Sequence, residues 1–166
     1  MLPAYVPNPV AAFLGGGTPI DGGKNFRDGR RIFGDGKTWR GFFAGVAAGV
    51  AMGMLQIFVY DTAGFTRLPV LTLPVVFLLS FGALLGDLVK SFFKRRLGKD
   101  RGASWPIADQ YDLVIGPFVL LLIFEYAWVV SSITLPILLW IIIITPLLHR
   151  AVNIIGYITG IKDVPW

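Results

Sequence analysis

Four stretches of the chain are long and apolar enough to cross a membrane, and they constrain the fold more than any other feature. A helix needs about 20 apolar residues to span a hydrocarbon core of about 30 Å. A shorter apolar stretch, Leu2–Leu14, carries three prolines, so we expect it to form a short or partial first span. The expected fold is an all-α, polytopic membrane helix bundle of about five transmembrane helices, in a single domain covering residues 1–166. The four long segments are Gly41–Tyr60, Leu68–Gly86, Leu113–Val130 and Ile133–Leu148.

The composition favours a membrane protein and excludes several other classes. Hydrophobic residues make up 55% of the 166 residues and charged residues only 15%, whereas soluble domains carry about 25% charged residues. The apolar content also excludes a disordered chain. The absence of cysteine excludes disulfides, thiolate metal sites and cysteine nucleophiles. The net charge of +5 comes from short basic stretches between apolar segments, so we expect contact with membrane lipids and no nucleic-acid partner.

Lysine and arginine alternate along the chain between dense and sparse segments. Residues 15–40 hold six, residues 61–67 one, residues 87–112 six, the turn at Ser131 and Ser132 none, and the tail after Leu148 two. Positive charge is concentrated in the cytoplasmic loops of membrane proteins. We therefore expect an integral cell-membrane protein with two polar cytoplasmic loops, a cytoplasmic C-terminus, an external N-terminus and an active site that faces the cytoplasm.

Glycines spaced four residues apart mark faces on which helices approach closely. Two of them, Gly82 and Gly86, lie in the second long segment. Small residues at this spacing let the backbones of membrane helices come into contact. We favour packing within the chain, with a homodimer face as the alternative. The first long segment carries Gly41, Gly45, Gly49 and Gly53.

The first polar loop, residues 15–40, combines repeated Asp-Gly steps with cations. The three pairs begin at Asp21, Asp28 and Asp35, and a basic residue follows each within three positions. Glycine lets the backbone approach a ligand closely, and exposed N–H groups beside Lys and Arg bind polyanions. The alternative is a flexible loop whose cations only set the topology. The candidate substrate-binding residues of this region are Asn8, Asp21, Lys24, Arg31, Asp35, Lys37 and Arg40.

The second polar loop, residues 87–112, begins on a helix that we expect to continue from the second long segment to about Leu97. Asp87, Lys90, Ser91 and Lys94 are spaced i, i+3, i+4 and i+7, so they share one face of that helix. This arrangement predicts a carboxylate at the membrane surface with cations beyond it.

Two further carboxylates, Asp109 and Asp112, lie three residues apart at the start of the third long segment. Together with Asp87 they stand at the ends of adjacent helices. Such a group suits Mg²⁺, which takes one or two carboxylates, waters and phosphate oxygens. The surrounding cations suit a nucleoside triphosphate. A salt-bridged helix cap is the alternative interpretation.

These motifs resemble those of the CDP-archaeol synthase family, which is related to the bacterial phosphatidate cytidylyltransferases. The resemblance covers nearly the full length of the chain. Two features depart from the bacterial pattern: Arg95 and Lys99 are one residue closer, and no Gly-His-Gly-Gly follows Pro106. The strings that carry the resemblance are LPAYV at 2–6 with Asn8, GGGTPID at 15–21, DGRR at 28–31, GDGKT at 34–38, GDL at 86–88, SFFKR at 91–95, KD at 99–100, RGASWP at 101–106 and DQYD at 109–112.

The resemblance implies a reaction and a set of roles. CMP would pass from CTP to an unsaturated diether lipid phosphate, 2,3-di-O-geranylgeranylglycerol 1-phosphate, with release of pyrophosphate, in membrane phospholipid biosynthesis. It implies that Asp87, Asp109 and Asp112 bind Mg²⁺. The catalytic residues would be Asp87, Asp112, Lys90 and Lys94. The substrate-binding residues would also include Ser91, Arg95, Lys99 and Asp100.

Two rival functions remain open from the residues alone. An ion-coupled transporter would use broken helices and an intramembrane carboxylate such as Glu125, but it would place its polar groups near the midplane of the membrane. This chain places nearly all of them in the two polar loops. A CDP-alcohol phosphotransferase would carry DGxxAR, and only the Asp28-Gly29 step matches. The single histidine, His149, follows the last apolar segment and is expected to have a structural role at the interface.

Overall fold

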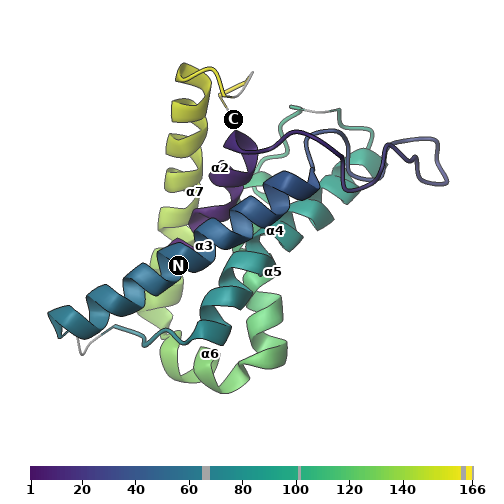
Figure 1. Cartoon of the computed structure of the whole chain (residues 1–166). Helices are drawn as coiled ribbons and strands as arrows, with labels where there is room; N and C mark the ends of the chain where they lie inside the picture. Colours follow the sequence, from purple (N-terminus) through teal and green to yellow (C-terminus); the bar gives the residue numbers. More distant parts are fainter. Residues whose placement is uncertain (65–67, 101, 162–163, 166) are drawn as a thin grey trace.

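The computed structural model describes residues 1–64, 68–100, 102–161 and 164–165, and within them the chain is all-helical (Figure 1). Arg67, Arg101 and Lys162, three of the cations counted for the topology, lie outside the described residues. The helices are α1 (Leu2–Tyr5), α2 (Pro7–Phe13), α3 (Trp39–Ala63), α4 (Leu73–Arg96), α5 (Ala108–Phe124), α6 (Tyr126–Ser132) and α7 (Leu135–Ile158).

Three helices, α3, α4 and α7, are long and apolar enough to cross a membrane, and the bent pair of α5 and α6 makes up to four in the described residues. The expected all-helical membrane fold is confirmed, with three to four candidate spans among the described residues against an expected number of about five. The segment Leu2–Leu14 forms α1 and α2. At 1.5 Å per residue these two helices together reach only about 18 Å, the length of a short or partial span, and they pack against α3 and α4.

The third long segment is broken, which the sequence did not predict. We expected one span over Leu113–Val130 and a turn at Ser131 and Ser132. The structure ends α5 at Phe124, and α6 leaves it at an angle of 116°. Glu125 forms the break with a non-helical backbone (φ −135°, ψ 40°). A carboxylate is costly at the centre of a bilayer, and the break moves Glu125 from the middle of a span to the end of α5.

Threonines start the two central helices. The Thr38 hydroxyl accepts a hydrogen bond from the backbone N–H of Gly41 at the start of α3, at 3.2 Å. Thr72 caps α4 in the same way, with Pro74 in the first turn. Proline costs no hydrogen bond there, because the N–H groups of a first turn have no partner within the helix. At its other end α4 continues to Arg96 with three cations in its last turn. These cations interact favourably with the negative end of the helix dipole.

The glycine faces are used within the chain. A methyl group on Gly45 would lie 2.7 Å from the Pro7 carbonyl of α2, and one on Gly53 would lie 2.2 Å from Val76 of α4. The glycines of α4 meet Gly116 of α5, where a methyl group would lie 2.1 Å from the Gly82 carbonyl oxygen. The favoured interpretation is confirmed for these faces, because α1, α2, α4 and α5 cover them and leave no room there for a second copy.

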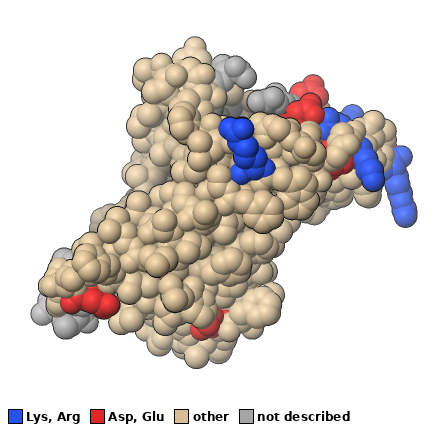
Figure 2. Space-filling view, viewed as in Figure 1, with Lys and Arg blue, Asp and Glu red and all other residues tan. Residues whose placement is uncertain are grey.

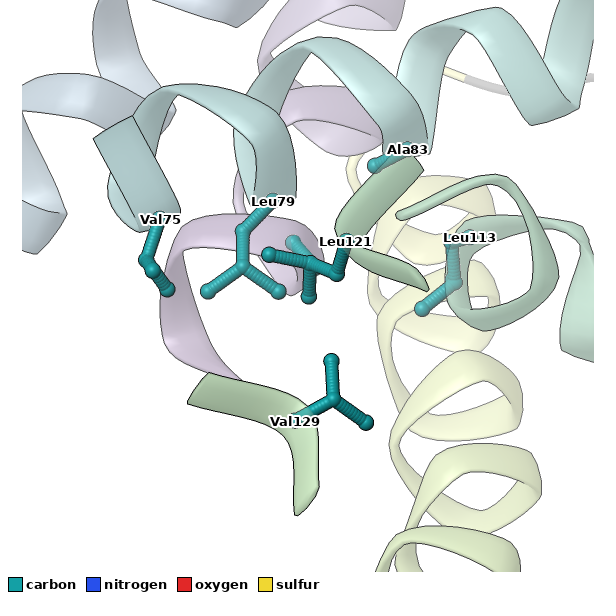
Figure 3. Close-up of a cluster of buried hydrophobic side chains, with 7 residues drawn as sticks. Val75, Leu79, Ala83, Leu113, Leu121 and Val129 are labelled. Atoms are coloured by element: carbon teal, nitrogen blue, oxygen red, sulfur yellow. The ribbon is translucent and has the colours of Figure 1, made fainter. Parts of the chain in front are cut away.

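The apolar core lies where α4 packs on α5. Val75, Leu79 and Ala83 of α4 point toward α5 and α6 (Figure 3). Their partners are Leu113 and Leu121 of α5, Val129 of α6 and Ala4 of α1. Outside this core most of the helix surface is apolar and exposed, as expected of helices that face lipid. Figure 2 shows Lys and Arg concentrated toward one end of the molecule, with a long face that carries none.

Replacing Gly116 by alanine is expected to separate α4 from α5 and to lower the stability of the folded protein. The added methyl group would meet the backbone of Gly82 and Gly86, which cannot move aside as a flexible side chain can. Overpacking of this kind costs about 1–3 kcal/mol. Thermal unfolding in detergent measures the effect. Ile115→Ala is the matched control on the same helix, because Ile115 is exposed; an equal loss in both variants would contradict the close crossing.

Candidate active site

The contact between α4 and α5 brings Asp87 and Asp112 together. A methyl group on Gly86 would lie only 2.3 Å from the backbone carbonyl oxygen of Asp112. Only glycine fits there, and the residue that follows it is Asp87. Both carboxylates are buried. The crossing of the two helices therefore fixes two acidic side chains from distant parts of the sequence at one point.

The Lys90 ammonium lies at the centre of this acidic group. Its Nζ is 3.1 Å from an oxygen of Asp87, 2.7 Å from an oxygen of Asp112 and 3.3 Å from an oxygen of Asp109. The Lys90 side chain is itself largely buried. Three carboxylates thus share one ammonium, which offsets the repulsion among them.

Two more lysines complete the group. Lys94 Nζ lies 3.0 Å and 3.1 Å from the two oxygens of Asp109, and Asp109 also accepts a hydrogen bond from the backbone N–H of Trp105 at 2.7 Å. Lys37 of the first polar loop pairs with Oδ2 of Asp87, whereas Lys90 pairs with Oδ1. We name these six side chains the aspartate–lysine cluster: Lys37, Asp87, Lys90, Lys94, Asp109 and Asp112.

Asp21 organises the first polar loop from within. Its carboxylate accepts hydrogen bonds from the backbone N–H groups of Gly23, Phe33 and Gly34 at 2.9–3.1 Å, and from Arg31 Nη2 at 2.6 Å. Burial opposes the charge, but the hydrogen bonds from Arg31 and the three backbone N–H groups outweigh it and hold the pKa of Asp21 far below its ordinary value. The side chain is used internally, so it shapes the loop from which Lys37 reaches the cluster.

The first polar loop is bound to the end of α4. Arg96 pairs with Asp28 at 3.0 Å and donates to the backbone carbonyls of Arg30 and Arg31. The Phe26 ring contacts the Phe92 ring edge-on at 5.3 Å, and the Arg96 guanidinium lies over both rings. Loop and helix therefore form one unit.

Asp21→Asn is expected to release this loop. Both carboxylate oxygens accept several donors, so an amide NH₂ on either side would face an N–H group. Faster trypsin cleavage after the basic residues of the loop, with α-helix content unchanged, is the expected result. Asp35→Asn is the matched control, since the Asp35 side chain is exposed and its one ion pair within the described residues is with Arg31. Equal cleavage of both variants would contradict the role of Asp21.

The lowered pKa of Asp21 also fixes the direction of a pH effect. The carboxylate stabilises the folded loop fully above the ordinary aspartate pKa of about 4. That stability is lost only as pH falls through the depressed pKa of the folded state. The wild-type loop should therefore still resist pepsin at about pH 4, where Asp21→Asn is already cleaved.

Comparison with known proteins decides the family. A family model described as CarS-like, CDP-archaeol synthase, matches residues 1–166. The chain belongs to the CDP-archaeol synthase family. CDP-archaeol synthases from Methanoculleus marisnigri and Methanosphaerula palustris are 62% and 60% identical to it over 166 residues, and each match covers 100% of both chains.

A solved structure of an intramembrane enzyme for archaeal membrane lipid biosynthesis has the same fold. It superposes with a TM-score of 0.66 at 32% sequence identity, and the match covers 98% of this chain and 90% of that one. The resemblance noted from the sequence motifs is thus confirmed. The CDP-archaeol synthase family also accounts for the full length of the chain, which leaves no support for a transporter or a CDP-alcohol phosphotransferase.

The other expected site residues of this CDP-archaeol synthase family member differ in burial and in their hydrogen-bond partners. Ser91 is buried on the same helix as Lys90. Arg95 donates to the backbone carbonyls of Phe33 and Lys99, so it joins the two polar loops. The exposed set is Lys24, Asp35, Arg40 and Asp100. Arg40 Nε donates to the Leu14 carbonyl and Lys99 Nζ to the Ser104 carbonyl.

A cavity of about 320 Å³ opens beside the aspartate–lysine cluster. Lys37, Asp87 and Lys90 line it, together with Asn8 of α2. The remaining walls are largely apolar and come from α2, α3, α4 and α7. Sequence reasoning missed the contribution of α7, which includes His149 and Asn153, hydrogen-bonded to each other. No spacing rule links α7 to the polar loops; only the fold places them together.

Proposed function

We propose that this family member transfers CMP from CTP to 2,3-di-O-geranylgeranylglycerol 1-phosphate, giving CDP-archaeol and pyrophosphate, at a site that faces the cytoplasm. The observation that carries the proposal is the convergence of Asp87, Asp109 and Asp112 on the ammonium of Lys90, beside Lys37 and Lys94. The orientation follows from the excess of Lys and Arg in the two polar loops.

The chemistry needs positioning and charge neutralisation more than proton transfer. A phosphate monoester has its second pKa near 6, so the lipid phosphate is largely a dianion at neutral pH and is already a nucleophile. One of its oxygens bonds to the α-phosphorus of CTP while the bond from that phosphorus to the β-phosphate oxygen breaks, and pyrophosphate leaves. The obstacle is repulsion between two anions, which cationic side chains reduce.

Three lysines of the cluster are placed to reduce this repulsion. Lys37 and Lys90 both line the cavity and both pair with Asp87, so a triphosphate that reaches Asp87 also reaches two ammonium groups. Lys94 lies one turn beyond Lys90 and pairs with Asp109. We assign Lys37 and Lys90 to the triphosphate and Lys94 to the pyrophosphate leaving group.

The three carboxylates of the cluster are suitable ligands for Mg²⁺. Oxygens of Asp87 and Asp112 both lie within hydrogen-bonding distance of one nitrogen, Lys90 Nζ, so a single cation can contact both. Within the described residues no three acidic or histidine side chains form a closed metal cage. Mg²⁺ needs none, because it binds through one or two carboxylates, waters and substrate phosphates. Asp87 and Asp112 would hold it, with Asp109 beside them, and the ion would neutralise phosphate charge.

The test is a reconstituted assay. Purified protein in detergent or liposomes receives Mg²⁺, labelled CTP and the diether lipid phosphate, and CDP-lipid and pyrophosphate are measured together. Equal amounts of both products are expected, with none when the lipid phosphate or Mg²⁺ is omitted. A parallel assay with a diester lipid phosphate measures chain preference. Absence of CDP-lipid with every lipid phosphate would overturn the proposed function.

A further inference from the structure

Asn8 carries a buried acceptor that no described residue satisfies. The side-chain oxygen Oδ1 is inaccessible and receives no hydrogen bond from the described residues. Asn8 lies on α2 between Pro7 and Pro9 and lines the cavity beside the aspartate–lysine cluster. A buried carbonyl oxygen without a donor costs about 1–3 kcal/mol, so this position favours a ligand that brings an N–H or O–H group.

The two substrates of the proposed reaction differ in whether they can supply that group. A diether lipid phosphate, as the dianion, carries ether and phosphate oxygens only, and all of them are acceptors. A cytosine base carries an exocyclic amine, which is a donor, beside a ring nitrogen that accepts. The Asn amide presents a carbonyl and an NH₂ in the complementary order. The unsatisfied Oδ1 therefore points to the nucleotide.

The rest of the cavity agrees with a nucleoside. Most of the other residues that line it are apolar, with Ala12 of α2 and Phe42 of α3 among them, and apolar walls suit the flat faces of a base. Lys37, Asp87 and Lys90 line the same cavity. A base held at Asn8 would therefore share the cavity with two ammonium groups that can bind its phosphates.

We propose that Asn8 is the residue that selects cytosine, by accepting a hydrogen bond from the exocyclic amine of the base. The inference rests on the proposed function and names the nucleoside end of the same site. UTP has a carbonyl oxygen at the position of the amine, so it would place an acceptor against Oδ1.

The test compares nucleotides that differ at the amine alone. Wild-type protein is assayed with CTP, with UTP and with the 2-pyrimidinone ribonucleotide, which lacks the amine. A preference for CTP over the 2-pyrimidinone of about 10-fold in kcat/KM is expected, the size of one buried hydrogen bond. Asn8→Ala should lose that preference, because kcat/KM for CTP falls further than kcat/KM for the 2-pyrimidinone nucleotide. Asn8→Asp keeps the acceptor and should retain the preference.

The outcomes separate this inference from the proposed function. No transfer by the wild type with any nucleotide defeats the proposed function itself. Transfer with an unchanged CTP preference in Asn8→Ala defeats the inference alone. The same holds if Asn8→Ala removes discrimination against 2′-deoxy-CTP instead, because the donor would then be a ribose hydroxyl. Thermal unfolding of each variant in detergent verifies the fold, and the nucleotide ratio is insensitive to partial loss of folded protein.

Discussion

Asp87→Asn is expected to reduce cytidylyl transfer by about 10³-fold, the scale of losing a charge that acts directly on the reacting groups. Asp87 is the only member of the aspartate–lysine cluster, among the described contacts, that pairs with a lysine from the first polar loop and a lysine from α4. An amide cannot hold both ammonium groups and is a poor ligand for Mg²⁺. The measurement is the initial rate of CDP-lipid formation at saturating CTP and Mg²⁺.

Asp61→Asn is the matched control for this substitution. Asp61 is an exposed residue near the C-terminal end of α3. The first polar loop joins the opposite end of that helix, at Trp39. The same chemical change there should leave the rate unaltered. Near wild-type turnover by Asp87→Asn, with the protein folded, would remove Asp87 from the proposed mechanism.

Lys90→Gln is expected to lower stability and at the same time to raise affinity for divalent cations. The substitution leaves three carboxylates without their shared ammonium, and breaking a buried ion pair costs about 3–5 kcal/mol. In a chain of this length that corresponds to a fall in melting temperature of about 10 °C. Asp87, Asp109 and Asp112 should then bind a divalent ion more tightly than in the wild type, because the Lys90 ammonium no longer competes for their oxygens.

Melting temperatures in EDTA and in Mg²⁺ or Mn²⁺ distinguish the two effects. The variant should melt well below the wild type in EDTA and recover more than the wild type when the ion is added. Lys24→Gln, at an exposed loop position, should change neither value. A variant that responds to the ion no more than the wild type would show that Lys90 and the metal do not share the carboxylates.

Local spacing predicted much of the site. A helix through residue 96 places Asp87, Lys90 and Lys94 on one face whatever the rest of the chain does, and in the structure Lys90 pairs with Asp87 while Lys94 pairs with Asp109. The Asp109 and Asp112 pair followed from the same argument. The motifs of the polar loops led to the CDP-archaeol synthase family, which the full-length match confirms.

The features that local spacing could not predict depend on contacts between distant segments. Arg96 holds Asp28 across 68 positions of sequence, and no pattern separates it from the neighbouring Arg95 or Lys94. The break at Glu125 is also hidden, because the apolar run continues on both sides of it. Counting apolar residues therefore predicted one straight helix where the structure has the bent pair of α5 and α6.

The placement of α7 has a consequence for how the lipid arrives. This helix packs chiefly on α5, yet Leu148 and Val152 form part of the cavity wall beside Lys37. Pulling two long isoprenoid chains into water would cost tens of kcal/mol, at about 0.8 kcal/mol per carbon group. We expect α7 to remove that need as a wall between the bilayer and the cavity: the lipid phosphate would diffuse within the membrane, enter sideways, and leave with a larger headgroup while its tails stay in the bilayer.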